Sequence, residues 1–346
     1  MKRQFLQLII LTTCLALAIQ FFFEPVVSAA LQVNIDRVTF TPHRQPWINI
    51  FVSVFDQEDL AVKGLDEKRF TIKEDGNVYS GPIEVEPFVT SERRLAYIIV
   101  LETQEKLATS MTLVCQGLQS FIKEMGFRYP GAILNYTGYP EVVIKPTRNA
   151  NLLIKKINEL KPVKGLPRLY DGLLTAVKEL NGYTGQSEFK ADRLAIILLT
   201  DGQDQGSMFS LAADETKMLQ SNISLFVIAY GKKERRSLSN LARITKETGG
   251  GYYFAHSPDL ISPLLAAVAG RLKYQYILTY PANNFTPDGR SHKVSVDIET
   301  ADDHGQGIHK FIMPELKTER IEILTTGILI GAALLVLLII VIKSRA

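Results

Sequence analysis

The sequence predicts a three-layer, doubly wound α/β region inserted into a β-sandwich. Three observations carry this prediction. Apolar runs alternate with amphipathic stretches between residues 95 and 270, the flanking segments 31–94 and 271–314 alternate apolar and polar residues, and long apolar runs lie near both chain ends. A chain of 346 residues is long enough for two folded units and additional targeting segments.

The composition limits the classes of partner. Hydrophobic residues make up 46% and charged residues 22% of the chain, which is typical of folded domains. The formal net charge of +3 comes from 39 basic and 36 acidic side chains that are mixed along the chain. Because nucleic-acid binding needs a one-sided basic field, we expect no nucleic-acid partner.

Residues 1–30 are predicted to be a signal peptide. Lys2 and Arg3 precede an apolar run from Phe5 to Phe23, and the small residues 28–30 follow it. Because this run is somewhat long for a cleaved signal, an uncleaved signal anchor is the alternative. Both interpretations predict export of the chain.

The first β-rich segment, 31–94, is justified by its rhythm. Residues 47–54 and 69–73 alternate apolar and polar side chains, and the sequence Glu-Asp-Gly-Asn at 74–77 indicates a turn. The same period returns after the α/β region, at 274–280 and 293–298. We expect both flanks to build one sandwich, because that satisfies sheet edges better than two isolated sheets.

The α/β region, 95–270, is expected to hold a parallel sheet covered by helices on both faces. Strands are predicted at 95–101, 131–136, 194–199, 224–230 and 251–254, and helices near 108–125, 150–160, 170–180, 210–220, 237–248 and 258–272. The glycines at 249–251 lack the Lys-Ser/Thr of a phosphate loop and predict a helix C-cap. Cys115 is the single cysteine left after signal removal, so no intramolecular disulfide is expected.

The C-terminal segments predict a membrane anchor. Residues 323–342 form an uncharged apolar run that is long enough to cross a hydrocarbon core of about 30 Å. Residues 315–322 are a juxtamembrane linker, and the tail 343–346, with two basic residues, is expected in the cytoplasm. The chain is therefore predicted to be a single-pass cell-membrane protein whose main part is extracytoplasmic, in the periplasm or at the cell surface. The glycines at 327 and 331 would permit close helix packing, which leaves a scaffold role open.

Three loop segments resemble those of the von Willebrand factor A (VWA) family, and the flanks, at 55–59, 70–76, 248–250, 276–280, 288–289 and 293–296, resemble those of its bacterial subgroup. The loop segments are 100–107, 169–173 and 198–204, and they occur in the family's chain order. The resemblance implies a Rossmann-like domain in which loops at the carboxyl ends of the strands hold a divalent cation. The family's ligands are an Asp-x-Ser-x-Ser motif, a threonine from the second loop and an aspartate from the third, at an edge where such sheets bind ligands.

This sequence departs from that pattern. Glu102 stands at the first Asp position, Gln104 and Lys106 stand at the two Ser positions, and Pro167 stands at the Thr position. Only Asp201 matches. Proline offers no side-chain oxygen, and an ammonium about 4 Å from a divalent ion repels it by about 8 kcal/mol at an effective dielectric constant of 20. We expect a degenerate metal-ion-dependent adhesion site with no bound metal or other cofactor.

Two alternatives concern the charge balance of this site. Lys106 could form a salt bridge with Asp201 or Glu102 and supply the positive charge that a cation supplies in relatives. Otherwise the site has decayed, and Lys106 is simply solvated. A different alternative retains Mg²⁺ or Ca²⁺, with Glu102, Gln104 and Asp201 as oxygen donors.

The function predicted from the sequence is recognition of a protein partner by the carboxyl-end loops. The candidate contact residues are Glu102, Gln104, Lys106, Pro167, Arg168, Asp201 and Asp204. An enzyme is not expected, because the histidines show no metal-ligand spacing and no serine lies in a Gly-x-Ser-x-Gly context. The alternatives are a cation-dependent adhesion receptor and, more remotely, an extracytoplasmic hydrolase whose nucleophile and base come from distant loops.

Overall fold

The computed structural model describes residues 31–40, 46–58, 60–105, 110–184, 191–210, 217–218, 223–231, 236–283, 285, 288–301 and 303–313. The predicted signal peptide, juxtamembrane linker, transmembrane helix and cytoplasmic tail all fall outside these residues, as does most of the helix expected at 210–220. No helix within the described ranges is both long enough and apolar enough to cross a membrane.

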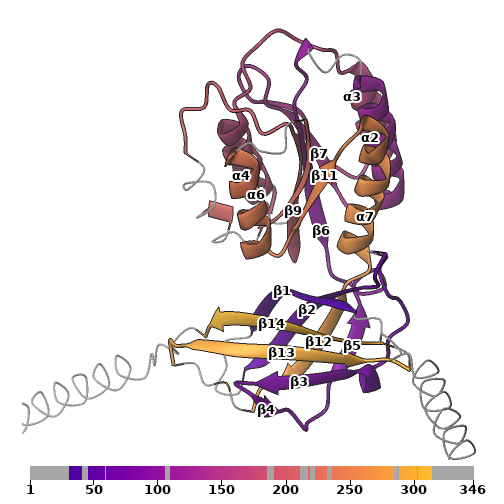
Figure 1. Ribbon diagram of the computed structural model, residues 1–346, viewed down its shortest axis with the longest axis vertical. Helices are drawn as coiled ribbons and strands as arrows, with labels where there is room; N and C mark the ends of the chain where they lie inside the picture. The colour runs from indigo at the N-terminus through magenta and orange to yellow at the C-terminus, as the bar shows by residue number, and fades with distance from the viewer. Residues whose placement is uncertain are drawn as a thin grey trace, which may run out of the picture.

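A six-stranded mixed sheet lies at the centre of the α/β region (Figure 1), with the strand order β11-β10-β9-β6-β7-β8. The strands are β6 (Leu95–Leu101), β7 (Gly131–Asn135), β8 (Glu141–Thr147), β9 (Arg193–Thr200), β10 (Ile223–Tyr230) and β11 (Gly251–Ala255). All neighbours except β8 pair in parallel. The five strands expected in this region are therefore present.

Strand β8 corrects the expectation of a purely parallel sheet. It pairs with β7 in the antiparallel direction. The link between the two strands spans only residues 136–140, whereas a parallel neighbour requires a long crossover. Lys145 and Pro146 suit its position at the edge of the sheet, since both residue types discourage further strand pairing.

Helices cover both faces of this sheet (Figure 1). One face packs on α2 (Met111–Met125), α3 (Ala150–Glu159) and α7 (Ile261–Lys273), the last preceded by the short η3 (Pro258–Leu260), and the other packs on α4 (Leu169–Thr184) and α6 (Arg236–Glu247). Successive residues of β6 enter the two cores in turn, as Tyr97 and Ile98 do. This is why its whole sequence is apolar, and the result is a three-layer α/β structure.

Two further sheets are built from both flanks of the chain. One has the order β1-β2-β12-β5 and the other β14-β13-β3-β4. Their strands are β1 (Gln32–Phe40), β2 (Trp47–Phe55), β3 (Phe70–Glu74), β4 (Asn77–Val78), β5 (Glu84–Pro87), β12 (Tyr276–Pro281), β13 (Ser291–Glu299) and β14 (His304–Ile312), with η1 (Glu67–Arg69) before β3. Ile50, Ile72, Leu278 and Val296 belong to one shared core between the sheets. The flanks thus form one sandwich, as expected.

A buried charge network joins the sandwich to the α/β region. Oδ1 of Asp36 on β1 lies 3.6 Å from Nη2 of Arg271 on α7, and its Oδ2 accepts hydrogen bonds from Ser53 and Gln275. Arg193 at the start of β9 is also buried, and this burial lowers its pKa to about 10 although the charge of Asp36 acts in the opposite direction. The junction therefore depends on one acid that faces the buried Arg193 and the half-buried Arg271.

Two turns predicted from the sequence are confirmed. Gly249 ends α6 with a φ of 66°, and the Gly250 amide donates to the Thr245 carbonyl at 2.8 Å, as in a helix C-cap. In the turn before β4, Asp75 has a φ of 46° and binds Nδ1 of His292 through Oδ2 at 2.8 Å. Turn and strand β13 are therefore fixed together.

His292 lies between two carboxylates. Besides Asp75, it binds Oδ1 of Asp288 through Nε2 at 3.1 Å. Burial alone would lower the pKa of His292, but the hydrogen bonds to Asp75 and Asp288 outweigh burial and raise this pKa above its ordinary value. The protonated ring is therefore the form that the fold favours.

The parallel strands of the α/β region begin next to the sandwich and end at the opposite tip of the molecule (Figure 1). Both Leu31 and Met313, the first and last described residues, form backbone hydrogen bonds within the sandwich, to His304 and Arg290. The loops at the carboxyl ends of the parallel strands consequently lie at the end of the molecule that is remote from the sandwich.

Candidate functional site

Three loops meet at the carboxyl edge of the sheet and are joined by backbone hydrogen bonds. The Val163 amide donates to the Thr103 carbonyl at 2.7 Å, which ties the segment before α4 to the loop after β6. The Gln205 amide donates to the Pro167 carbonyl at 2.9 Å, which ties the same segment to the loop after β9. The three segments that resemble the VWA loops are thus brought together, as expected for an open α/β sheet.

Glu102 follows β6 and is 2% exposed. The Tyr136 hydroxyl lies 3.3 Å from its Oε2 and 2.9 Å from Oγ1 of Thr200, and that same Oγ1 accepts the Gly202 amide at 2.9 Å. Glu102 is therefore part of a buried polar cluster at the ends of β6, β7 and β9, and not an exposed loop side chain.

Burial and the charge of this cluster raise the pKa values of two tyrosines. Burial, followed by the charge of Glu102, raises the pKa of Tyr136 and of Tyr230 well above the ordinary value, and Asp201 acts in the same direction on both. Each phenol therefore stays protonated and keeps a hydrogen to donate beside the two carboxylates.

Asp201 follows β9 and is 5% exposed. Its Oδ1 accepts the Gln203 amide and its Oδ2 accepts the Gln203 side-chain amide, both at 2.8 Å. On the facing loop, Nε2 of Gln104 donates to the Gly165 carbonyl at 2.6 Å. Both Asp201 and Gln104 are thus engaged with protein groups at the place where the family pattern puts metal ligands.

Pro167 pairs with Thr137 in an isolated β-bridge, and Arg168 begins the turn into α4. The Arg168 guanidinium carbon lies 4.1 Å from the centre of the Tyr139 ring, and its Nη1 lies 3.7 Å from Oδ2 of Asp171. Proline supplies no side-chain oxygen, and the hydroxyl of its bridge partner Thr137 accepts the Thr103 amide at 2.8 Å.

Asp204 caps helix α4. Its Oδ1 accepts the Leu169 amide at 2.9 Å and the Ser207 hydroxyl at 2.5 Å. In return, Oδ1 of Asp171 in the first helical turn accepts the amides of Met208 and Phe209 at 2.8 and 3.0 Å. The loop after β9 is therefore fixed to the helix, and the proposed contact of Asp204 with a partner stays a prediction.

Lys106 lies outside the described residues, so its salt bridge with Asp201 or Glu102 also stays a prediction. Within the described part of the chain, no three histidine, cysteine, aspartate or glutamate side chains cluster as a metal site would require.

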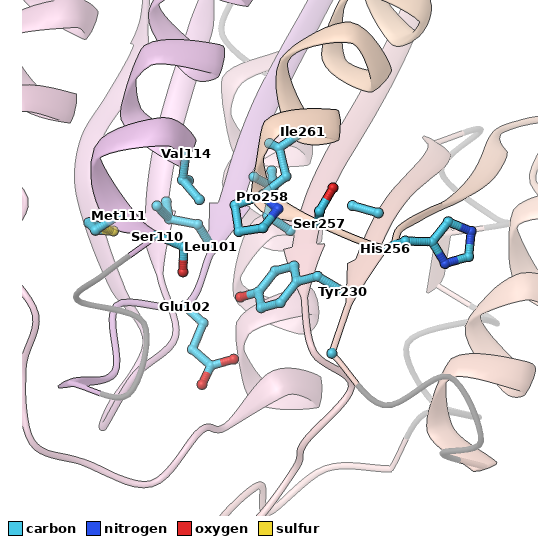
Figure 2. A pocket seen from close by; sticks show the side chains of 13 residues that line it. Leu101, Glu102, Ser110, Met111, Val114, Tyr230, His256, Ser257, Pro258 and Ile261 are labelled. Atoms are coloured by element: carbon cyan, nitrogen blue, oxygen red, sulfur yellow. The ribbon is translucent and has the colours of Figure 1, made fainter.

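The carboxyl edge also has a pocket of about 250 Å³, which the sequence did not reveal (Figure 2). Apolar side chains from β6, α2 and α7 line it, among them Leu101, Val114 and Ile261. Glu102 and Tyr230 lie together at one side, and the His256 ring points away from the apolar side chains. Neither tyrosine of the edge was predicted as a site residue, because Tyr136 and Tyr230 end predicted strands and resemble core residues.

Residues 105–262 match the family model of the von Willebrand factor type A domain. The chain contains a VWA domain. The match includes most of the α/β region, whereas Glu102, Gln104 and both β-rich flanks lie outside it. The chain that contains this match has a central mixed sheet flanked by helices, with additional β-sheets.

The solved structures that are similar to the chain include the following three. The conserved hypothetical protein BatB from Bacteroides thetaiotaomicron is 14% identical over 52% of this chain and 99% of that chain, with a TM-score of 0.41. The von Willebrand factor type A protein from Catenulispora acidiphila is 11% identical over 84% and 74%, with a TM-score of 0.46. The vWF domain of the type V pili tip protein Mfa5 from Porphyromonas gingivalis is 12% identical over 52% and 95%, with a TM-score of 0.43. No curated protein matches the chain.

Proposed function

We propose that this VWA protein is membrane-anchored and extracytoplasmic, and that it binds a protein partner through its carboxyl-end loops without a divalent cation. The observation that carries the proposal is the engagement of Asp201, the one residue that matches the family's metal ligands. Both of its carboxylate oxygens accept hydrogen bonds from Gln203. The loop is therefore held by protein contacts where a cation would otherwise hold it.

The other donors at this edge also fit a cation poorly. A hard cation such as Mg²⁺ requires about six oxygen ligands in near-octahedral geometry. Pro167 offers none from its side chain, and the Gln104 amide nitrogen is directed to the Gly165 carbonyl. Glu102 is placed beside the protonated Tyr136 hydroxyl. Direct protein contacts are consequently the better basis for recognition.

The orientation of the fold supports a role at a membrane surface. The apolar run 323–342 follows the sandwich in the sequence, and the carboxyl-end loops lie at the opposite end of the molecule (Figure 1). An anchor at 323–342 would therefore direct these loops away from the membrane, outside the cytoplasm, where a partner can reach them.

A binding role, rather than catalysis, is supported by two groups that commonly act as nucleophile or base. Burial raises the pKa of the Cys115 thiol, which disfavours the reactive thiolate. His292 has both ring nitrogens bound to carboxylates and lies in the sandwich, far from the carboxyl-end loops. Cys115 is therefore a poor nucleophile, and His292 is not placed to act on a molecule held at the edge.

Calorimetric titration of the full chain with Mg²⁺, Mn²⁺ and Ca²⁺ tests the metal-independent part of the proposal. We expect no saturable heat from the unmodified protein. The same titration of Lys106→Ser shows whether the lysine excludes the ion, since this change removes a positive charge and adds a hydroxyl ligand. Saturable binding by the unmodified chain would contradict the proposal and favour a cation-bridged, acidic ligand.

Site-specific photo-crosslinking in cells tests the partner-binding part. A photoreactive residue replaces Val163, which is 40% exposed at the carboxyl edge, or Phe127, which is 81% exposed next to the amino end of β7. We expect a discrete adduct with another protein from position 163 that persists with a chelator, and none from position 127. Adducts from position 127 alone, or loss of the adduct with chelator, would refute the proposal.

A further inference from the structure

The carboxyl edge carries an exposed apolar surface on the side of α4. Tyr139, Leu166, Met208 and Phe209, here called the tip patch, are 76%, 56%, 77% and 45% exposed. Single exposed apolar side chains are normal on soluble proteins, whereas a group of large ones marks an interaction site. The four residues come from three different loops, so only the fold brings them together.

Contacts between the loops bring the tip patch to one side of the carboxyl edge. The Gly138 amide donates to the Leu166 carbonyl at 2.9 Å, which places Tyr139 beside Leu166. The loop after β9 approaches the same residue, because a Cβ added to Gly206 would lie 3.7 Å from Cβ of Leu166 and 3.3 Å from Cγ of Arg168. Arg168 also stacks on the Tyr139 ring, which joins the loop after β7 to the segment before α4.

The patch is also held in one conformation. The amides of Met208 and Phe209 both donate to Oδ1 of Asp171, which is 6% exposed. Oδ2 of Asp171 in turn faces Arg168. Since the backbone beneath the exposed side chains is hydrogen-bonded, a partner would meet a preorganised surface and lose little loop entropy on binding.

The charges around the patch are mainly positive. The segment 161–168, Lys-Pro-Val-Lys-Gly-Leu-Pro-Arg, contains three cationic side chains and no acid. Lys161 and Lys164 are exposed, and Nζ of Lys178 lies 5.7 Å from the centre of the Phe209 ring. Glu141, which begins β8, is the exposed acid beside Tyr139. Glu105, next to the Gln104 that pairs with Val163, is a second exposed acid. Among the described residues at this rim, the exposed cations Lys161, Lys164 and Lys178 therefore outnumber these two exposed acids.

We propose that the tip patch binds an acidic amphipathic segment of a partner protein. The apolar side chains of this segment pack on Tyr139, Leu166, Met208 and Phe209, and its carboxylates face Lys161 and Lys164. The inference rests on the proposed function, because it names the partner chemistry for the same edge. A protein segment is favoured over a lipid surface, since the patch lies at the tip opposite the sandwich that precedes the apolar run 323–342 (Figure 1).

The probe is a labelled amphipathic helical peptide of leucine and glutamate, measured by fluorescence anisotropy with the full chain. A peptide in which lysine replaces every glutamate is the comparator. We expect the acidic peptide to bind at least about tenfold more tightly than the basic one, and its affinity to fall as salt is added. Leu166→Ser and Phe209→Ser are each expected to weaken binding about tenfold. Phe127→Ser, the matched exposed control, is expected to leave it unchanged.

Equal affinity for both peptides, or an equal loss in Phe127→Ser, would overturn the inference. Binding of phosphatidylglycerol vesicles that Leu166→Ser abolishes would overturn it in favour of a lipid surface. The proposed function fails separately. If Leu166→Ser loses peptide binding but keeps the adduct from position 163, the partner does not use the tip patch, and only the inference fails. If the unmodified chain binds the peptide but gives no adduct from position 163, the proposed function is contradicted.

Discussion

Replacement of Asp204 by alanine removes the acceptor at the N-terminus of α4. Oδ1 of Asp204 binds the Leu169 amide and orients the Ser207 hydroxyl. That hydroxyl oxygen accepts the amides of Tyr170 and Asp171, both at 3.1 Å. The first three amides of the helix thus depend, directly or through Ser207, on one carboxylate.

The magnitude of the loss follows from two contributions. Removal of an N-cap acceptor costs about 0.5–2 kcal/mol, and removal of a negative charge near a helix N-terminus costs about 0.3–1 kcal/mol. The free energy of unfolding of Asp204→Ala should therefore fall by about 1–3 kcal/mol. Asp204→Asn keeps an oxygen acceptor and loses only the charge, so its loss should be about 0.3–1 kcal/mol.

Urea unfolding of the full chain, followed by far-ultraviolet circular dichroism, measures these differences. The single tryptophan, Trp47, lies in β2 of the sandwich, so its fluorescence reports separately on that part. A loss of less than about 0.5 kcal/mol in Asp204→Ala, or an equal loss in Asp204→Asn, would refute the capping argument. If Asp204→Asn retains stability but loses the adduct from position 163, Asp204 contacts the partner directly.

The other predictions concern packing, pH and the junction. Gly172→Ala should lower the free energy of unfolding by about 1–3 kcal/mol, because its Cβ would lie 2.6 Å from Cβ of Tyr136, whereas Gly182→Ala on the same helix meets no atom within 4 Å and should stabilise. A raised pKa means that protonated His292 contributes stability in full below its unfolded pKa of about 6.5, and that this contribution is lost as the pH rises through the folded pKa. Urea titrations should show this loss in the unmodified chain and not in His292→Asn. Asp36→Ala removes the acid that faces the buried Arg193 and the half-buried Arg271, and it should cost about 3–5 kcal/mol by the same assay. A loss below about 1 kcal/mol would contradict a shared junction network.

Strand β6 was predictable because it is buried on both faces, so all seven of its residues are apolar. Strand β8 was not, because its side chains are half-buried or exposed and it contains Lys145 and Pro146, which interrupt any regular pattern. The end of α4 was predicted four residues early. Asn181 and Gly182 suggest a turn, but the helix continues to Thr184, since local preference is weaker than continued helical hydrogen bonding.

The candidate site shows a similar division. Glu102 and Asp201 could be placed at the carboxyl edge because each directly follows a predictable strand. Tyr136 and Tyr230 could not, since a tyrosine at the end of a predicted strand has the same pattern whether it packs in a core or lies beside a buried carboxylate. The pocket was also out of reach, because its lining joins Leu101 to Ile261 across most of the VWA domain.

Burial separates the charges that a partner would encounter at this edge. Glu102, Asp171 and Asp201 are at most 6% exposed and accept protein hydrogen bonds, whereas Lys161 and Lys164 point into solvent. Exposed charges are screened by salt and direct association, while buried acids act mainly on their own neighbours. Recognition by direct charge contacts should therefore weaken with salt and ignore chelators, whereas cation-bridged recognition should be lost with a chelator. Measuring one partner adduct with added salt and with a chelator therefore distinguishes the two mechanisms, even without the identity of the partner.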